Sequence, residues 1–323
     1  MSSLTTNAFA LGALTVLRGV NKDLGTVQEQ VSSGYKIETA SDNPSYWSMA
    51  NTMRSDSASL KTIGDAMSLG SSKIDTAYTA TTTVVDLLTE IQSKLVTAKE
   101  AGVDKTQVNS DIQSLKKQLE STIESASFSG DNWLYNTATA ASTTKSIVSN
   151  FTRGTSGAVT LTTVDYDASQ SLFIDTSDPS RGLLTKDVDA NTINPDGTST
   201  ARNYYLLTPD SGTGATGGTE IALSSSTTDS EVTDMLAVTS SLLKSATSAA
   251  SAMGVVQARV NQQTSYVSTL QTAIDTSVGD LVDADMDEAS SRITALQTAQ
   301  QLGVQSLSIA NTMASKMLIL LQS

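Results

Sequence analysis

Apolar residues recur at every third or fourth position at both ends of the chain, and this spacing limits the fold more than any other feature. A 3–4 alternation places these residues along one side of a helix, which is the pattern of a coiled-coil partner face. The N-terminal seam consists of Ala10, Ala13, Leu17, Val20, Leu24, Val27 and Val31. The C-terminal seam consists of Met286, Ala289, Ile293, Leu296, Gln300, Gly303, Leu307, Ala310, Ala314, Met317 and Leu321. Both ends are therefore predicted to pack lengthwise against other helices.

The last helix also carries apolar residues outside its seam. These are Leu302, Val304, Ile309, Met313, Leu318, Ile319 and Leu320. A helix that is apolar almost all round requires burial on nearly every side. One interpretation is a buried helix of a large monomeric bundle. We favour a second one, in which the ends order only on self-assembly, as segments that fold on binding do, and the contact repeats head to tail into an open filament. Asn311, beside the seam, either sets the register or is exposed.

Composition excludes most catalytic chemistry. The chain has no His and no Cys, which removes the usual base near neutral pH, thiol nucleophiles, zinc clusters and disulfides. Its 20 basic and 33 acidic residues give a net charge of −13, which argues against nucleic acid, because binding phosphates requires Lys and Arg. We therefore expect no enzyme activity, no metal and no cofactor.

The sequence also predicts no membrane insertion. No stretch approaches the roughly 20 apolar residues that a membrane helix needs. The beginning, MSSLTTN, lacks a basic region followed by a long apolar run, so we expect no cleaved secretory signal.

Helix-ending and helix-starting residues divide the chain into long helical stretches. A first helix, from about residue 3 to 33, is predicted to end at Gly34, which suits a left-handed C-terminal cap. Asn43-Pro44 offers an N-cap followed by Pro at the first helical position of a second helix, which ends near Ala101-Gly102. We interpret Gly34, Asn43 and Pro44 both as helix punctuation and as the joint between two layers of helices.

Two capping motifs begin the later helices. Asp104 precedes a shorter helix, with Gln107 three residues on, and Thr228 pairs with Glu231 at the start of a long one. We expect a break near Ser277–Gly279 before the last helix.

The centre of the chain shows turn and strand patterns in place of helical periodicity. Ser129-Gly130-Asp131-Asn132 predicts the turn of a β-hairpin. Strand signals follow at 158–166, 172–175, 204–208 and 220–223, separated by turn clusters at 194–197 and 211–218.

The expected fold class is mainly α: a long antiparallel helical hairpin, or coiled-coil bundle, of N- and C-terminal segments with a small central β-rich domain. Residues 1–42 and 280–323 form a terminal coiled-coil domain. Residues 43–144 and 228–279 form a helical bundle with a β-hairpin. Residues 145–227 form a surface-exposed β-rich domain.

Two segments carry a resemblance to a known family. Residues 31–50 read VSSGYKIETASDNPSYWSMA, and this resembles the N-terminal signature of bacterial flagellins. Residues 283–289, DADMDEA, and 296–311, LQTAQQLGVQSLSIAN, are similar to their C-terminal signature. The variants YWS at 46–48 and DNWL at 131–134 resemble flagellins of rhizobia and related alphaproteobacteria most.

The resemblance implies a self-polymerising subunit of the flagellar filament, used for swimming. In that family the terminal helices form the inner tube, the next helices form its outer wall, and the insert faces solvent. The implied partners are copies of the chain, other flagellins, an export chaperone that covers the last helix, the filament cap and the hook-junction proteins. Export by the flagellar type III apparatus implies an extracellular location without a cleaved signal peptide.

The implied assembly residues comprise most residues of the two seams together with a few off-seam positions. They are Ala10, Ala13, Leu17, Val20, Leu24, Val27, Val31, Ile293, Leu296, Leu302, Gly303, Leu307, Ala310, Asn311, Met317, Leu320 and Leu321.

The chain departs from the family pattern in two places. Ala314 and Leu321 stand where many members have a Pro and an aromatic tail. Thr97 and Ala101 stand where members recognised by animal innate immune receptors commonly have Arg and Leu, so we expect weak recognition. Two alternatives stay open: a hook–filament junction protein, which shares flagellin-like ends, and a coiled-coil surface adhesin.

Overall fold

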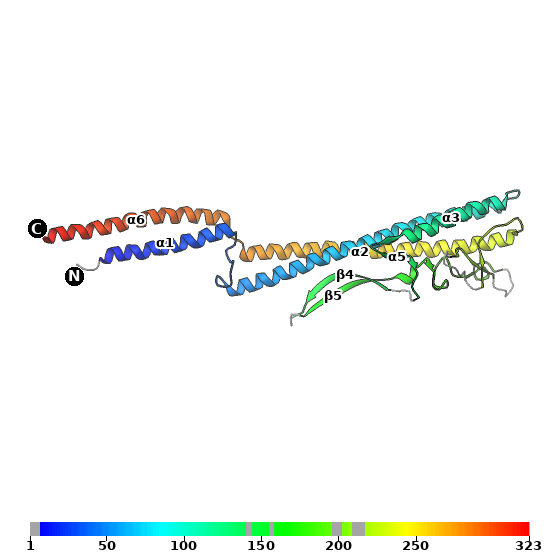
Figure 1. Cartoon of the computed structure of the whole chain (residues 1–323), viewed down its shortest axis with the longest axis horizontal. Coiled ribbons are helices and arrows are strands. Elements are labelled where there is room, and N and C mark those ends of the chain that lie inside the picture. Colours follow the sequence, from blue (N-terminus) through cyan, green and yellow to red (C-terminus); the bar gives the residue numbers. More distant parts are fainter. Residues whose placement is uncertain (1–6, 140–143, 155–157, 196–201, 209–216, 323) are drawn as a thin grey trace. The chain divides into compact units, whose positions relative to one another are not determined.

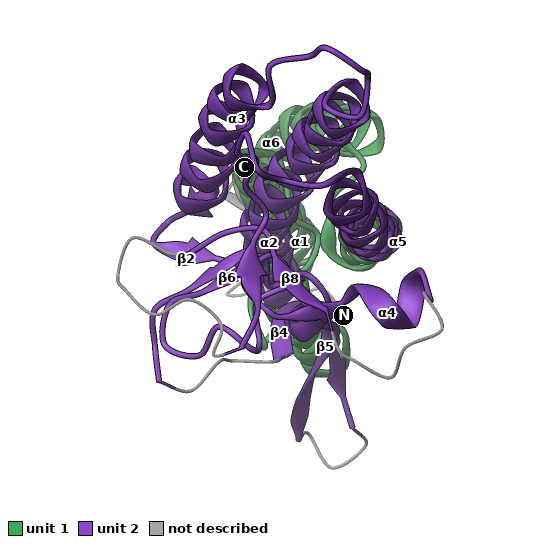
Figure 2. Cartoon of the chain, turned by 90° about the vertical axis from the view of Figure 1, so that its right-hand side faces the viewer, with its two compact units in different colours: residues 1–58, 270–323 green, residues 59–269 purple. Residues whose placement is uncertain are grey.

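The computed structural model describes residues 7–139, 144–154, 158–195, 202–208 and 217–322, with side chains up to Met313 in the last helix. The chain forms two compact units, Met1–Ala58 with Leu270–Ser323, and Ser59–Thr269 (Figure 2). We call them unit 1 and unit 2. The main helices are α1 Ala8–Ser33, α2 Pro44–Thr97, α3 Lys105–Ser125, α5 Asp229–Val282 and α6 Met286–Gln322 (Figure 1). These long helices and the strand-rich centre confirm the expected mainly α fold.

The predicted helix ends form as their side chains dictate. Gly34 ends α1 in the left-handed conformation, at φ 79°, and its N–H donates to the carbonyl of Gln30. The Asn43 side chain accepts hydrogen bonds from the backbone N–H groups of Ser45 and Tyr46 at the start of α2. These contacts replace partners that a helix terminus lacks.

The later capping motifs are also present. Asp104 accepts hydrogen bonds from the N–H groups of Thr106 and Gln107 before α3. Thr228 and Glu231 complete a reciprocal capping box before α5, because the N–H of each residue donates to the side chain of the other.

The core of unit 2 lies between α2, α3 and α5. The apolar stripe of each helix is buried against the other two, and α2 and α5 run antiparallel, since Thr81 contacts Met253 and Met67 contacts Thr264. Fully buried members include Met67, Ile74, Val84, Leu88, Ile91, Leu95, Ile112, Leu119, Ile123, Val232, Val238, Ala246 and Met253. Each of these helices therefore turns one apolar stripe toward the core.

The strands of unit 2 lie on one side of its helices (Figures 1 and 2). β1 Ser127–Phe128 and β2 Asp131–Asn132 form the predicted hairpin, and Ser129 and Gly130 both have positive φ, as a type I′ turn requires. The other pairings are a two-stranded antiparallel ribbon, a short parallel pair and a three-stranded sheet. Their strands are β4 Thr144–Arg153, β5 Val159–Asp167, β3 Tyr135–Asn136, β6 Ile174–Asp175, β7 Val188–Asp189, β8 Asn203–Tyr205 and β9 Thr219–Glu220, with α4 Ala190–Ile193 between β7 and β8.

The β4–β5 ribbon meets α2 at a glycine. A Cβ atom on Gly70 would lie 2.5 Å from Cγ2 of Ile147, which is buried. The missing side chain of Gly70 therefore leaves the space that Ile147 fills.

Two expectations were wrong. The break near Ser277–Gly279 does not exist: α5 continues to Val282, because Val278 and Val282 are buried in a small core that holds this last turn in place. The ten-residue strand β4 was not predicted. The turn clusters at 194–197 and 211–218 fall mainly outside the described residues.

Candidate assembly interface

α1 and α6 lie side by side in unit 1 and run in opposite directions (Figure 1). Asn7 caps α1 by accepting a hydrogen bond from the N–H of Ala10. Asp285 caps α6 by accepting from the N–H groups of Asp287 and Glu288. The pair is thus a two-helix arm built from both ends of the chain.

Small residues bring the two helices close together. A Cβ atom on Gly303 would lie 3.0 Å from Cδ1 of Leu17, so Leu17 packs directly on the backbone of α6. Polar contacts accompany this packing. The Asn7 side chain donates to the carbonyl of Ala310 at 3.0 Å, and Gln300 donates to Asn21 at 2.7 Å.

The structure brings most of the predicted seam residues together between these helices. Leu24, Val27, Ala289 and Ala310 are buried. Most of the others are half-buried, namely Ala10, Ala13, Leu17, Val20, Val31, Ile293, Leu296, Gln300, Gly303 and Leu307, whereas Met286 is exposed. One partner helix therefore covers the seam only in part.

Other predicted residues lie elsewhere. Leu302 is 60% exposed, and Asn311 is also exposed. The side chains of Met317, Leu320 and Leu321 lie outside the described residues.

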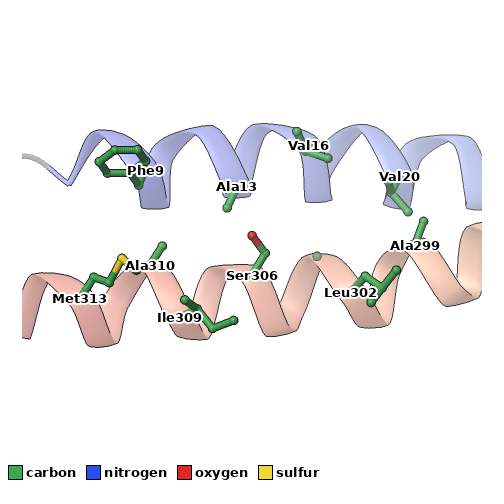
Figure 3. A pocket seen from close by; sticks show the side chains of 11 residues that line it. Phe9, Ala13, Val16, Val20, Ala299, Leu302, Ser306, Ile309, Ala310 and Met313 are labelled. Carbon is green, nitrogen blue, oxygen red and sulfur yellow. The ribbon is translucent and has the colours of Figure 1, made fainter.

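An open apolar groove of about 600 Å³ runs along one side of the arm (Figure 3). Phe9, which is 81% exposed, and Met313, which is 63% exposed, lie at its outer end. The groove is lined by Phe9, Ala13, Val16, Val20, Ala299, Leu302, Gly303, Ser306, Ile309, Ala310 and Met313.

Sequence reasoning missed Phe9 and Val16 on the α1 side of this groove. Phe9 and Val16 belong to a second stripe, with Ala13 and Val20, that is also spaced by three or four residues. Tracing every such stripe, rather than the best one, would have found it.

The groove contains no ionisable group. Residues 7–17 and 293–313 carry no Asp, Glu, Lys or Arg. A surface of this kind can bury apolar partners but offers no acid, base or nucleophile. Among the described residues no cluster of three or more potential metal ligands exists, and no helix is long and apolar enough to cross a bilayer.

Charged groups in unit 2 hold the fold together instead. Lys116 is buried, and its ammonium donates to the carboxylate of Glu220 at 2.8 Å and to the carbonyl of Ile221. Burial lowers the pKa of Lys116 despite this carboxylate. Lys105 forms an ion pair with Asp229 at 2.9 Å, so α3 is tied at two places to the segment that enters α5.

Asp175 is a second buried anchor. Burial alone would raise the pKa of its carboxyl group, but hydrogen bonds from Arg181, Asn136 and the N–H groups of Asp178 and Ser177 outweigh burial and hold this pKa below its usual value. The ionised carboxylate therefore organises the loop after β6.

Comparison with known proteins matches the two helical ends of the chain to one family. Residues 4–139 match the bacterial flagellin N-terminal helical region, and residues 236–321 match the bacterial flagellin C-terminal helical region. The chain is 51% identical to Flagellin C of Rhizobium meliloti (strain 1021), with all of both chains covered. It is 34% identical to Flagellin B of Rhizobium meliloti, covering 99% of this chain and 100% of that one. It is 32% identical to a Brucella melitensis flagellin, covering 97% and 96%.

Proposed function

The chain belongs to the bacterial flagellin family, and we propose that the α1–α6 arm is the surface through which it polymerises. As a flagellin it is a structural subunit of the flagellar filament, an extracellular homopolymer that serves motility, rather than an enzyme. What remains to be assigned is which residues make the contacts.

One observation carries this assignment: the arm leaves large apolar side chains in water when the chain is alone. Phe9, Leu302 and Ile309 border the groove and are at least 60% exposed. A contiguous exposed apolar surface marks an interaction site. The occupant that suits it is an uncharged apolar helix, and the arm of a second copy provides one.

The proposed domain roles follow from membership of the flagellin family. We assign residues 1–42 and 280–323 to the inner tube, 43–144 and 228–279 to the outer wall, and 145–227 to the filament surface. The matched helical regions, 4–139 and 236–321, leave the third segment out. This supports its role as a solvent-facing insert whose sequence is free to vary.

The remaining partners are those that membership of the flagellin family implies. Before assembly, an apolar arm needs a cover to remain soluble, and an export chaperone that binds α6 supplies one. Export through the flagellar type III apparatus, without a cleaved signal, then delivers the chain to the filament cap. Hook-junction proteins form the first layer on which polymerisation begins.

Weak recognition by innate immune receptors is also proposed. Thr97, the last residue of α2, and Ala101, in the following turn, are both exposed. They replace a guanidinium and a larger apolar side chain on an accessible surface. A receptor reporter assay with purified monomer should show reduced signalling, and full-strength signalling would contradict this proposal.

The decisive test of the assembly surface is Leu307→Asp, compared with Ser308→Asp. Leu307 lies half-buried between α1 and α6, whereas Ser308 is exposed beside it. We expect electron microscopy after salt-induced polymerisation to show filaments from the Ser308 variant only. Circular dichroism should show a folded unit 2 in both. Normal filaments from Leu307→Asp would contradict the assignment.

A further inference from the structure

The two chain segments that connect the arm to the following helices are hydrogen-bonded to each other. The N–H of Ala284 donates to the carbonyl of Gly34 at 2.9 Å. The N–H groups of Lys36 and Ile37 both donate to the carbonyl of Val282, at 2.7 and 3.3 Å. We call these residues, 34–37 and 282–284, the clamp. We propose that the clamp sets the register in which α1 and α6 pair.

Side chains fix the clamp in place. Ile37 and Val282 are buried in a small separate core with Ala50 and Val278. The Lys36 ammonium donates to the carbonyl of Asp280 at 2.7 Å. These contacts lie within unit 1 and require no second copy of the chain.

Contacts between α1 and α6 lie at similar numbers of residues from the clamp on both helices. Tyr35 pairs with Asp283 at the clamp. Farther out, Asn21 contacts Gln300, Leu17 contacts Gly303, and Asn7 contacts Ala310. From position 35 to position 7 is 28 residues, and from 283 to 310 is 27 residues. At the contact between Asn21 and Gln300 the two spacings differ most, 14 residues against 17, which is still less than one helical turn.

The seam itself defines this alignment weakly. A slip of one helical turn, four residues or about 6 Å, would replace Gly303 opposite Leu17 by Ala299 or Leu307, which are also apolar. In coiled coils, buried polar residues and flanking charges choose between such registers. Here the arm has no charges along 7–17 or 293–313, and the Gln300–Asn21 hydrogen bond is exposed.

The clamp also lowers the entropic cost of bringing α1 and α6 together. Gly34 and Ala284 are separated by most of the chain, so pairing their helices directly would close a very long loop. Once the clamp has formed, each further contact is only a few residues away from the previous one. Pairing then proceeds from the clamp toward the chain ends.

Disulfide trapping tests the proposal, because the chain contains no other cysteine. A Cβ atom on Gly303 would lie 3.8 Å from Cβ of Leu17, which is about the separation found in disulfides. Leu17→Cys with Gly303→Cys should therefore form an intramolecular disulfide. Leu17→Cys with Ala299→Cys should not. Both are oxidised after polymerisation and read by mass spectrometry of the dissociated chains, in which a disulfide within one chain keeps the mass of the monomer.

The register is then challenged by inserting Ala-Gln-Ala-Gln after Ser291, an exposed position in α6. This keeps the clamp and the α6 cap but moves the rest of the helix by four residues. If the clamp sets the register, the disulfide of Leu17→Cys changes from position 303 to position 299. A disulfide that stays at position 303, or the loss of both, would overturn the proposal.

A second variant acts on the clamp alone. Ala284→Pro removes the donor to the carbonyl of Gly34. In the chain without the insertion, it should allow Leu17→Cys to cross-link at both 299 and 303. An unchanged preference for 303 would also overturn the proposal. The proposal rests on assembly through the arm, but its readout is the position of a disulfide within one chain and not the presence of filaments, so the two outcomes are distinguishable.

Discussion

Leu302→Ala should weaken filament assembly without weakening the monomer. The Leu302 side chain is 60% exposed in the single chain and borders the groove. Fully burying a leucine contributes about 1.5–3 kcal/mol, so covering the exposed part in the filament contributes about 1–2 kcal/mol. Because about 1.4 kcal/mol corresponds to a tenfold change in an equilibrium constant, the critical concentration for polymerisation should rise about 5- to 30-fold.

The matched control is Leu161→Ala. Leu161 is also a leucine, is 57% exposed, and lies in β5 of the segment proposed to face solvent. Its loss should leave the critical concentration unchanged. Both variants should melt with the wild type in thermal circular dichroism, since neither side chain is buried in the single chain.

The assay is sedimentation after salt-induced polymerisation, with the monomer remaining in the supernatant measured across total concentrations. An equal rise for both leucines would mean that the β-rich segment is buried to the same extent as the arm. No rise for Leu302 would mean that the groove stays open in the filament. Either result would refute the reasoning.

Three further changes test the fold of unit 2. Gly70→Ala should cost about 1–3 kcal/mol by overpacking, measured by thermal unfolding. In an Ile147→Ala background the same change should cost little, because the clashing atom is gone. Asp175 has a lowered folded-state pKa, so its contribution is present above the unfolded value of about 4 and is lost as the pH falls through the folded pKa. Asp175→Asn should therefore flatten the dependence of the urea midpoint on pH below pH 4, and an unchanged slope would contradict this. Thr228→Ala breaks the capping box with Glu231 and should lower stability by about 0.5–2 kcal/mol in urea unfolding.

The sequence was sufficient for features that local side chains determine. Gly34, Asp104 and the Thr228–Glu231 pair each satisfy backbone groups within a few residues, so their positions could be predicted correctly. The seams of α1 and α6 could be predicted for a similar reason, because their period is a property of the helix itself.

Features that depend on distant contacts could not be predicted. α5 continues past Gly279 because Val278 and Val282 pack against Ile37 and Ala50, far away in the sequence. β4 was missed because its Ser, Thr and Asn residues weaken the strand signal, and it is its ribbon partner β5 and the space at Gly70 that position it. The clamp could not be predicted from the sequence, because its hydrogen bonds join backbone groups, which do not depend on the residue type.

The absence of ionised side chains from the lining of the groove has an environmental consequence. Dissolved ions weaken attraction between exposed charges, but the groove has none to screen. Cohesion through it should persist from rainwater to brackish soil, and anions such as sulfate, which strengthen apolar burial, should increase it. The flagellar filament should then stay assembled while the salinity around the cell changes.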